Sequence, residues 1–439
     1  MKLVSQKASA LHGTVRLPGD KSISHRAAIL AASAEGESRV DGFLRAGVTQ
    51  VMLDSLASAG VQWRWEGGAL VVTGNGRDEF RAGPRPLYCG NSATTFRLLS
   101  GLLAGRPLFQ SELGSDEFIL DATEQLRRRP MRRVTDPLRR MGASIRSVQQ
   151  PDCAPLGITP SQLTGIDYDM PVASAQVKSA ILLAGLSASG STLVREPSPS
   201  RDHTERLLRA LGVRLEDAPS GVRVFPIDRP LPPLSVRVVG DFSSAAFLLV
   251  AGLIVPGSEI ILRDVGLNPR RTGLLAALRR MGADIAELDR SETNGEPRGD
   301  LRVRAGPLAA TIVEGAEVVD MIDEFPVLAV AAARAEGTTI VQNAAELRHK
   351  ESDRISMLAI ELGKIGVAVA ETPDGFSIRG PADIRGGKVD SHGDHRLAMA
   401  MAVAGLVAKA GVEVEGAESI SESFPNFSEL MNSLGAQMA

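Results

Sequence analysis

Residues 17–26 read LPGDKSISHR, and the rest of the chain is built on the pattern that they begin. A short alternating strand over residues 13–17 leads into a Pro-Gly turn, and Ser22 takes the expected N-cap position of an Ala-rich helix. Lys21, Ser22 and Arg26 would then crowd one helix N-terminus, where free backbone N–H groups and the helix dipole favour an anion. The stretch therefore predicts an anion-binding site.

A polar turn followed by a helix that is apolar on nearly every face recurs along the whole chain. Because such a helix has to be buried, we expect these helices inside each domain, with their N-termini pointing the same way. Converging N-termini would attract a polyanionic substrate. The six stretches start at Lys21, Cys89, Val172, Gly240, Asp320 and His392.

A second kind of helix alternates with the first: it is amphipathic, ends in glycine and leads into a strand. The spacing of about 70 to 84 residues leaves room for two helices and about four strands per repeat, so six repeats predict two domains of three. The six glycines are Gly60, Gly142, Gly212, Gly282, Gly366 and Gly435.

The boundary between the domains is predicted at Gly240, after a Pro-rich run and a strand. Residues 21–240 then form one domain, and residues 1–20 plus 241–439 form the other, with crossovers near 20 and 240. The polar stretch 291–300 lacks periodicity and is predicted to be a surface hairpin loop.

Composition limits the classes of function. The 439 residues carry a net charge of −3, which argues against a general nucleic-acid or anionic-membrane binder and favours a small acidic ligand. Cys89 and Cys153 are too few for a disulfide framework, which is typical of a reduced, cytoplasmic protein. The histidines lack metal-ligand spacing, and no signal peptide or membrane helix is evident. We therefore expect a cytoplasmic protein with no metal or cofactor, and, because no interface stripe is evident, a monomer.

Seven blocks, in order, resemble those of the 5-enolpyruvylshikimate-3-phosphate synthase family over essentially the whole chain: LPGDKSISHR, RPM, SAQVKSA, SRDHTE, MIDEFP, LRHKESDR and DHRLAM. The resemblance implies an α/β fold, a two-domain inside-out barrel with three βαβαββ units per domain. It also implies transfer of the enolpyruvyl group of phosphoenolpyruvate to the 5-hydroxyl of shikimate 3-phosphate, through a tetrahedral intermediate and with release of phosphate, on the route to chorismate and aromatic amino acids.

The resemblance assigns site residues in both domains. Asp323 is the implied base toward the 5-hydroxyl, and Glu351 and Lys21 are the alternatives for proton exchange at the methylene carbon. The N-terminal-half domain is expected to bind mainly shikimate 3-phosphate, and the other to carry the phosphoenolpyruvate and catalytic groups. Implied contacts of shikimate 3-phosphate are Lys21, Ser22, Arg26, Ser174, Ala175, Gln176, Arg201, Asp323 and Lys350. Implied contacts of phosphoenolpyruvate are Lys21, Ala93, Arg129, Gln176, Arg354 and Arg396.

Ala93 and Glu422 are among the positions that depart from the family pattern. Ala93 stands where glycine is common, and its methyl group is expected to crowd the inhibitor glyphosate and to reduce sensitivity to it. Glu422 stands where a lysine is usual, and it would repel phosphate unless it points away. His395, beside Arg396, either packs in its helix or contacts a ligand; the sequence leaves both open.

Two alternative functions share the same fold. The related transferase that acts on UDP-N-acetylglucosamine has a Lys-Asn pair and a loop cysteine, whereas this chain has Lys21-Ser22 and no cysteine in a comparable loop. A catalytically silent anion-binding protein of the same fold would not require Asp323 and Glu351 beside anionic ligands. Phosphate release in the presence of both substrates separates this last alternative from an enzyme.

Overall fold

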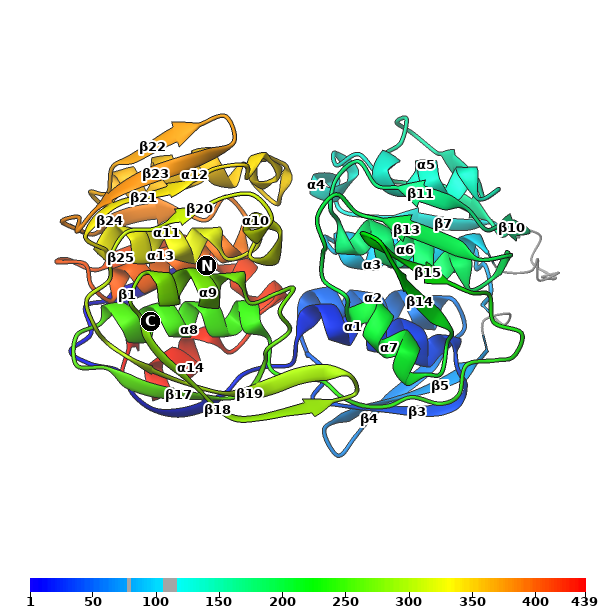
Figure 1. Cartoon of the computed structure of the whole chain (residues 1–439), viewed down its shortest axis with the longest axis horizontal. Helices are drawn as coiled ribbons and strands as arrows, with labels where there is room; N and C mark the ends of the chain where they lie inside the picture. The colour runs from blue at the N-terminus through cyan, green and yellow to red at the C-terminus, as the bar shows by residue number, and fades with distance from the viewer. Residues whose placement is uncertain (77–79, 106–116) are drawn as a thin grey trace. The chain divides into compact units, whose positions relative to one another are not determined.

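The computed structural model describes residues 1–76, 80–105 and 117–439. The chain divides into two compact units (Figure 1). Unit 1 comprises Met1–Pro18, Val239–Glu292 and Pro297–Ala439, and unit 2 comprises Gly19–Val238 and Thr293–Glu296. The chain therefore changes unit after Pro18 and after Val238, and again on either side of the four residues 293–296.

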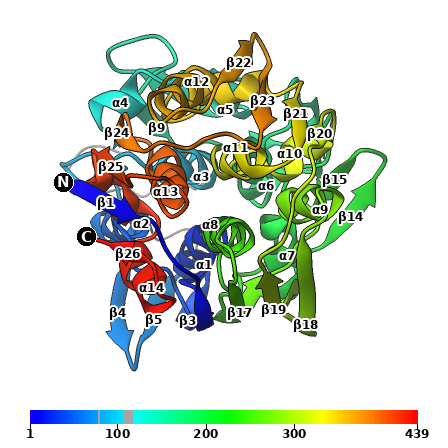
Figure 2. The ribbon, with the colours of Figure 1, turned by 90° about the vertical axis from the view of Figure 1, so that its left-hand side faces the viewer.

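The helices predicted to be buried are all present, and they form the interior of each unit. Every residue of Phe242–Ile254 is buried, for example, because the run FSSAAFLLVAGLI offers water no polar face. Figure 2 shows α8, α11 and α13 end on, side by side in the middle of unit 1. The helices are α1 (Lys21–Ser33), α3 (Ala93–Ala104) and α6 (Ala175–Gly185) in unit 2, and α8 (Phe242–Ile254), α11 (Phe325–Arg334) and α13 (His395–Gly405) in unit 1.

The amphipathic helices and their terminal glycines are confirmed. All six predicted glycines have a positive φ, between 78° and 105°, a region in which a Cβ atom would clash with the backbone. Each glycine therefore ends its helix and turns the chain toward the next strand. The helices are α2 (Gly47–Ser58), α5 (Arg132–Arg140), α7 (His203–Ala210), α9 (Gly273–Arg280), α12 (Arg354–Lys364) and α14 (Phe427–Ser433).

Within the described residues, six four-stranded sheets share one pairing pattern: an edge strand runs parallel to its neighbour, and the next two pairings are antiparallel. Each unit has three of these sheets. In unit 1 they are β18 (Asp284–Thr293), β19 (Glu296–Arg304), β17 (Glu259–Gly266), β2 (His12–Arg16); β20 (Ile312–Val313), β21 (Gly337–Val341), β23 (Gly375–Gly380), β22 (Val369–Thr372); and β24 (Gly387–Asp390), β25 (Val412–Glu415), β1 (Lys2–Gln6), β26 (Gln437–Met438). In unit 2 they are β16 (Ser235–Arg237), β3 (Glu35–Asp41), β5 (Ala69–Asn75), β4 (Gln62–Glu66); β6 (Leu87–Tyr88), β7 (Phe118–Asp121), β9 (Leu156–Thr159), β8 (Ser144–Ser147); and β11 (Asp167–Asp169), β13 (Thr192–Arg195), β15 (Gly221–Val224), β14 (Leu215–Ala218).

Short elements complete the chain, and none of the described helices is long and apolar enough to span a membrane. The short elements are α4 (Glu124–Arg127), α10 (Glu317–Asp320), the 3₁₀ helices η2 (Ala345–His349) and η3 (Ala417–Glu422), and the paired strands β10 (Leu163–Thr164) and β12 (Ala188–Ser189).

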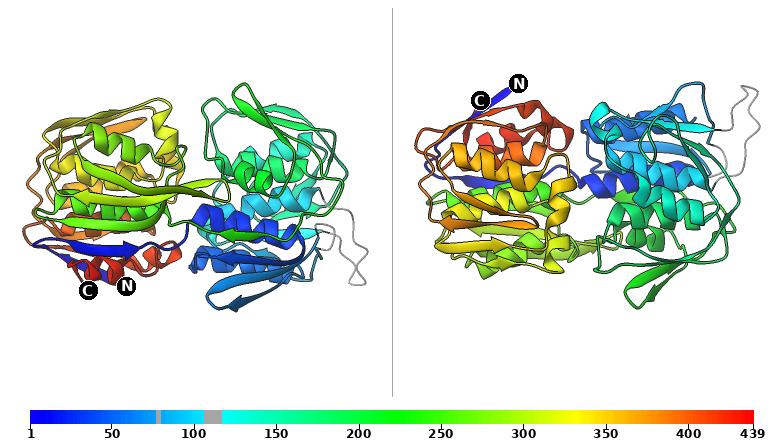
Figure 3. Two further views of the ribbon diagram at one scale, coloured as in Figure 1. Left: turned by 60° about the horizontal axis from the view of Figure 1, so that its bottom comes forward. Right: turned by 90° about the horizontal axis from the view of Figure 1, so that it is seen from above.

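The first eighteen residues complete the sheets of the C-terminal half. β1 lies between β25 and β26, and β2 pairs with β17 in parallel. The two chain ends consequently lie near each other in unit 1 (Figure 3). One sheet thus contains strands from both ends of the chain, which lie more than 400 residues apart in the sequence.

One local prediction is wrong, and a second is right about the turn but wrong about the strands. The N-cap of α1 is Asp20, not Ser22: Asp20 Oδ1 accepts the backbone N–H of Ile23 at 2.9 Å, so the helix begins at Lys21. The stretch 291–300 forms a hairpin, as predicted, with its turn at Asn294 (φ 51°) and Gly295 (φ 78°), but the residues on both sides of this turn belong to the strands β18 and β19 and not to a loop. Asn-Gly is the strongest local hairpin signal, whereas the weak periodicity gave no sign that the strands reach so close to the turn.

Candidate active site

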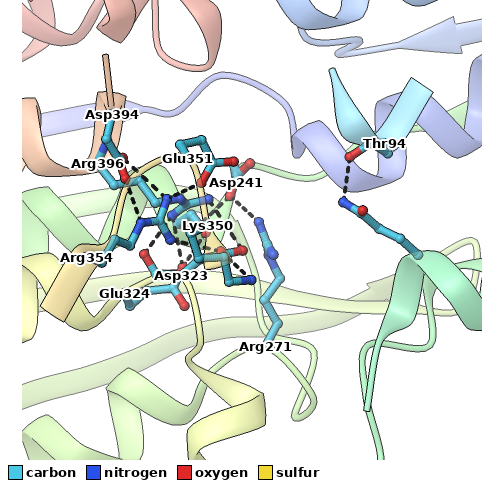
Figure 4. Close-up of polar contacts among 12 residues, drawn as sticks. Thr94, Asp241, Arg271, Asp323, Glu324, Lys350, Glu351, Arg354, Asp394 and Arg396 are labelled. Atoms are coloured by element: carbon cyan, nitrogen blue, oxygen red, sulfur yellow. Dashed lines mark hydrogen bonds and ion pairs between the residues drawn. The ribbon is translucent and has the colours of Figure 1, made fainter. Parts of the chain in front are cut away.

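The N-termini of the three buried helices of unit 2 meet. His25 Nε2, on α1, lies 3.2 Å from the Oγ of Ser92, the N-cap of α3. Gln176 Nε2, in the first turn of α6, donates to Thr94 Oγ1 on α3 at 2.9 Å (Figure 4). The predicted convergence of helix N-termini is therefore confirmed within this unit, where it creates a local region that favours anions.

Lys21, Ser22 and Arg26 occupy the first turns of α1. Lys21 and Ser22 are half-buried, whereas Arg26 is buried. The Arg26 guanidinium donates to Thr204 Oγ1 at 2.6 Å, to Ser179 Oγ at 2.8 Å and to the carbonyl of Ser22 at 3.0 Å. Arg26 therefore ties α1 to α6 and α7, a structural role that the sequence did not predict.

Gln176 has a second partner that the sequence analysis missed. Arg97 Nη1, on α3, donates to Gln176 Oε1 at 2.5 Å. Ala93 is the first residue of α3 and is 9% exposed, while Ser174 is the N-cap of α6 and Ala175 its first residue. The available signal was the one charged residue of this mostly apolar helix, one turn after the predicted contact at Ala93.

Arg129 and Arg201 lie beside short helical segments of unit 2. Arg129 is half-buried and follows α4, with its backbone N–H donating to the carbonyl of Leu126 at 3.0 Å. Arg201 is half-buried and precedes α7. Neighbouring Arg127 forms an ion pair with Asp121, with 2.5 Å between Nη2 and Oδ2. The ligand contacts of Arg129 and Arg201 stay predictions.

The buried helices of unit 1 also meet at their N-termini. Ser243, in the first turn of α8, donates to Glu324 Oε1 at the N-cap of α11. Arg396, in the first turn of α13, lies 3.4 Å from the same oxygen and donates to the carbonyl of Asp323 at 3.1 Å. Glu324 thus links three helix N-termini, a role for which the sequence alone carried no signal.

The carboxylate of Asp323 is surrounded by three cations (Figure 4). Its oxygens lie 3.4 Å from Arg354 Nη1, 3.6 Å from Arg396 Nη2 and 3.8 Å from Lys350 Nζ. Burial lowers the pKa of Lys350, a change that the negative charge of Asp323 only partly opposes. Four of the predicted site residues therefore come together, and a carboxylate among cations can handle a proton beside an anionic ligand.

Arg354 is 1% exposed and is held by two further carboxylates. Its Nε donates to Asp394 Oδ2 at 2.8 Å, and its Nη2 donates to Glu351 Oε2 at 2.8 Å. Burial acts to lower the pKa of Arg354, but the charges of Asp394 and Glu351 outweigh it and raise that pKa. Likewise, Arg354 keeps the pKa of Asp394 below its usual value in spite of burial. The predicted residues Glu351 and Arg354 are thus in direct contact.

Asp394 and the pair Arg271–Asp241 are further residues that the sequence analysis missed. Asp394 caps α13, since its Oδ1 accepts the backbone N–H of Arg396 at 2.9 Å. Arg271 Nη2 lies 2.7 Å from Oδ1 of Asp241, the N-cap of α8, and both are buried (Figure 4). The preference for aspartate at N-caps could have identified both carboxylates.

The structure places the two residues whose side-chain direction the sequence left open, His395 and Glu422, at opposite ends of their helices. His395 is buried as the first residue of α13, and Glu422 is half-buried at the end of η3. Within the described ranges, no cluster of three or more His, Cys, Asp or Glu side chains is arranged to hold a metal ion.

Comparison with known proteins connects this arrangement to one family. The family model of EPSP synthase (3-phosphoshikimate 1-carboxyvinyltransferase) matches residues 5–431. The 3-phosphoshikimate 1-carboxyvinyltransferase of Geobacter sulfurreducens is 47% identical over 437 residues, which cover 100% of each chain. That of Xanthomonas euvesicatoria pv. vesicatoria is 49% identical over 434 residues, which cover 98% of this chain and 96% of the relative.

Solved structures agree. EPSP synthase from Acinetobacter baumannii has a TM-score of 0.87 at 38% identity and covers 100% of this chain and 99% of its own. The enolpyruvyl transferase NikO from Streptomyces tendae, at 19% identity and a TM-score of 0.80 over 100% of this chain and 98% of its own, shares the fold. The predicted α/β enolpyruvyl transferase fold is confirmed, and the chain belongs to the EPSP synthase family.

Proposed function

We propose that this protein transfers the enolpyruvyl group of phosphoenolpyruvate to the 5-hydroxyl of shikimate 3-phosphate and releases phosphate. The observation that carries the proposal is the carboxylate of Asp323 within 3.4 to 3.8 Å of Arg354, Arg396 and Lys350. Two substrates with two carboxylates and two phosphates between them require such a concentration of cations. Relatives that are 47–49% identical bear the name of this activity.

The reaction is an addition followed by an elimination. The 5-hydroxyl oxygen bonds to C2 of phosphoenolpyruvate while its proton leaves and another proton adds to the methylene carbon, which gives a tetrahedral intermediate. The C2–O bond to phosphate then breaks, and the new methyl group loses a proton to restore the double bond. Asp323 takes the hydroxyl proton, and Glu351 exchanges the proton at carbon, with Lys21 as the alternative.

The remaining assignments are binding roles. Arg129, Arg354 and Arg396 hold phosphoenolpyruvate, whose pocket Ala93 borders and narrows against glyphosate. Shikimate 3-phosphate is held by residues of unit 2 together with Asp323 and Lys350. The residues of unit 2 are Lys21, Ser22, Arg26, Ser174, Ala175, Gln176 and Arg201.

Phosphate release with and without shikimate 3-phosphate tests the activity. Asp323→Asn and Glu351→Gln keep the shape of each side chain and remove its ability to carry a proton, so kcat should fall by about 10²- to 10⁴-fold. Glu314→Gln, an exposed carboxylate of the same unit, is the matched control and should leave kcat unchanged. Release that does not depend on shikimate 3-phosphate would overturn the proposal, as would full activity of Asp323→Asn.

A cytoplasmic monomer completes the proposal. The two cysteines, one buried and one half-buried and neither in a disulfide, suit a reducing compartment. Light scattering during size-exclusion chromatography would measure the mass in solution, and a mass near 46.4 kDa is expected for one chain.

A further inference from the structure

The loop 391–394, which joins β24 to α13, places Asp394 and leads directly into Arg396. Inside the loop, the N–H of Asp394 donates to the carbonyl of Ser391 at 2.8 Å, and the N–H of His392 donates to Asp390 Oδ1 at 2.6 Å. His392 has φ 51°, a left-handed conformation that is costly for a residue with a Cβ atom. Contacts from outside the loop therefore have to hold this conformation.

Glu361 of α12 supplies the contact to His392 itself. Its carboxylate is fully buried and accepts from His392 Nε2 at 2.7 Å and from the backbone N–H of Asp390 at 2.9 Å. Lys364 Nζ lies 2.8 Å from both oxygens. Burial would raise the pKa of Glu361, but the hydrogen bonds from Lys364 and His392 outweigh it and lower that pKa. The carboxylate is therefore charged and can only accept, so His392 Nε2 carries a proton toward it.

The loop is attached to one face of α12 at two points. Arg354 and Glu361 lie seven residues apart, which is two helical turns, or about 10.5 Å along the axis, and places them on the same side. Arg354 holds Asp394 at the end of the loop, and Glu361 holds His392 and Asp390 at its start. Figure 2 shows β24, which leads into the loop, beside α12.

We infer that Glu361 and His392 are positioning residues, which clamp the loop 391–394 to α12 so that Arg354 and Arg396 are aimed together at the anionic groups of phosphoenolpyruvate. The inference rests on the proposed function for its ligand and on the contacts above for its geometry. Neither residue touches the reacting atoms; each acts through Asp394. Loss of the clamp should therefore raise the KM for phosphoenolpyruvate more than it lowers kcat.

The experiment compares His392→Ala, His392→Gln and a control. His392→Ala removes the donor to Glu361 and should raise the KM for phosphoenolpyruvate about 3- to 10-fold, since the lost hydrogen bond is to a charged group at a partly exposed site. The KM for shikimate 3-phosphate should stay unchanged. His392→Gln restores a donor and should recover most of the loss. Lys409→Gln breaks an exposed pair with Asp383 that contacts neither the loop nor Glu361, and should leave both KM values unchanged.

Hydrogen exchange of the amides of residues 390–394 tests the clamp without any need for activity. Exchange should be faster in His392→Ala than in the wild type, and it should return to the wild-type rate in His392→Gln and stay at that rate in Lys409→Gln. Unchanged exchange in His392→Ala overturns the clamp. Faster exchange with an unchanged KM for phosphoenolpyruvate overturns its link to the ligand. A wild type without phosphate release overturns the proposed function, while the exchange result still decides the clamp.

Discussion

Replacement of Asp394 separates the two tasks that one carboxylate performs. It accepts hydrogen bonds from the side chain of Arg354 and, as N-cap of α13, from the backbone N–H of Arg396. Asp394→Asn keeps an N-cap acceptor and removes the charge, whereas Asp394→Ala removes both. The pair of variants therefore measures the buried ion pair and the helix cap separately.

The expected losses follow from burial. Breaking a buried ion pair costs about 3–5 kcal/mol, but Arg354 keeps Glu351 at 2.8 Å and Asp323 at 3.4 Å, so Asp394→Asn should lower the free energy of unfolding by about 2–4 kcal/mol. Asp394→Ala should cost about 1 kcal/mol more, because it also loses the cap. Asp383→Asn breaks an exposed pair with Lys409 and should change stability by less than about 1 kcal/mol.

Urea denaturation followed by two signals gives the measurement. Trp63 and Trp65 are the two tryptophans of the chain, and both lie in β4 of unit 2. Their fluorescence reports on unit 2, whereas far-ultraviolet circular dichroism reports on both units, so a loss confined to unit 1 shifts only the second signal. If Asp394→Asn unfolds with the free energy of the wild type, Arg354 does not depend on this charge. If the two Asp394 variants coincide, the cap contributes nothing.

Two other predictions concern unit 2. Ala93→Gly should remove the methyl group that narrows the proposed phosphoenolpyruvate pocket and make glyphosate inhibition about 5- to 150-fold stronger; an unchanged inhibition constant would refute the argument. Burial lowers the pKa of His25 to about 4, so the unfolded chain takes up the proton first as the pH falls below 6.5. The contribution of the neutral imidazole to the free energy of unfolding is therefore complete above pH 6.5 and falls by up to about 3 kcal/mol toward pH 4. Urea denaturation at several pH values, followed by tryptophan fluorescence, would measure this fall. His25→Asn should flatten this dependence, and an identical pH slope in the variant would contradict it.

The sequence predicted the helices and their ends well, because the signals are local. An apolar run such as Phe242–Ile254 has to be buried wherever it lies, and a glycine such as Gly142 can end a helix at a positive φ without help from distant residues. The prediction of a helix start failed where two nearby side chains could both serve as the N-cap. Asp20 and Ser22 are both good N-caps, and the choice depends on which side chain reaches a free backbone N–H group.

The hairpin at residues 291–300 was predicted, but the extent of its strands β18 and β19 was missed, for a different reason. Its strands carry polar residues on much of their length, so alternation of apolar and polar residues is weak over residues 291–300. Pairing of β19 with β17 nevertheless places both strands in a sheet. Glu296, expected at the surface, is 3% exposed and contacts His203 at 2.7 Å.

The sequence alone thus determined the repeat, the buried and amphipathic helices, and the types of residue that carry charge in the site. Only the tertiary structure decided which charges meet: Arg354 with Asp394 across 40 residues, and Arg97 with Gln176 across 79. Periodicity and capping act within one or two helical turns, and therefore leave their mark on a short stretch of sequence. Contacts between helix N-termini depend on how whole repeats pack, and no local pattern records that packing.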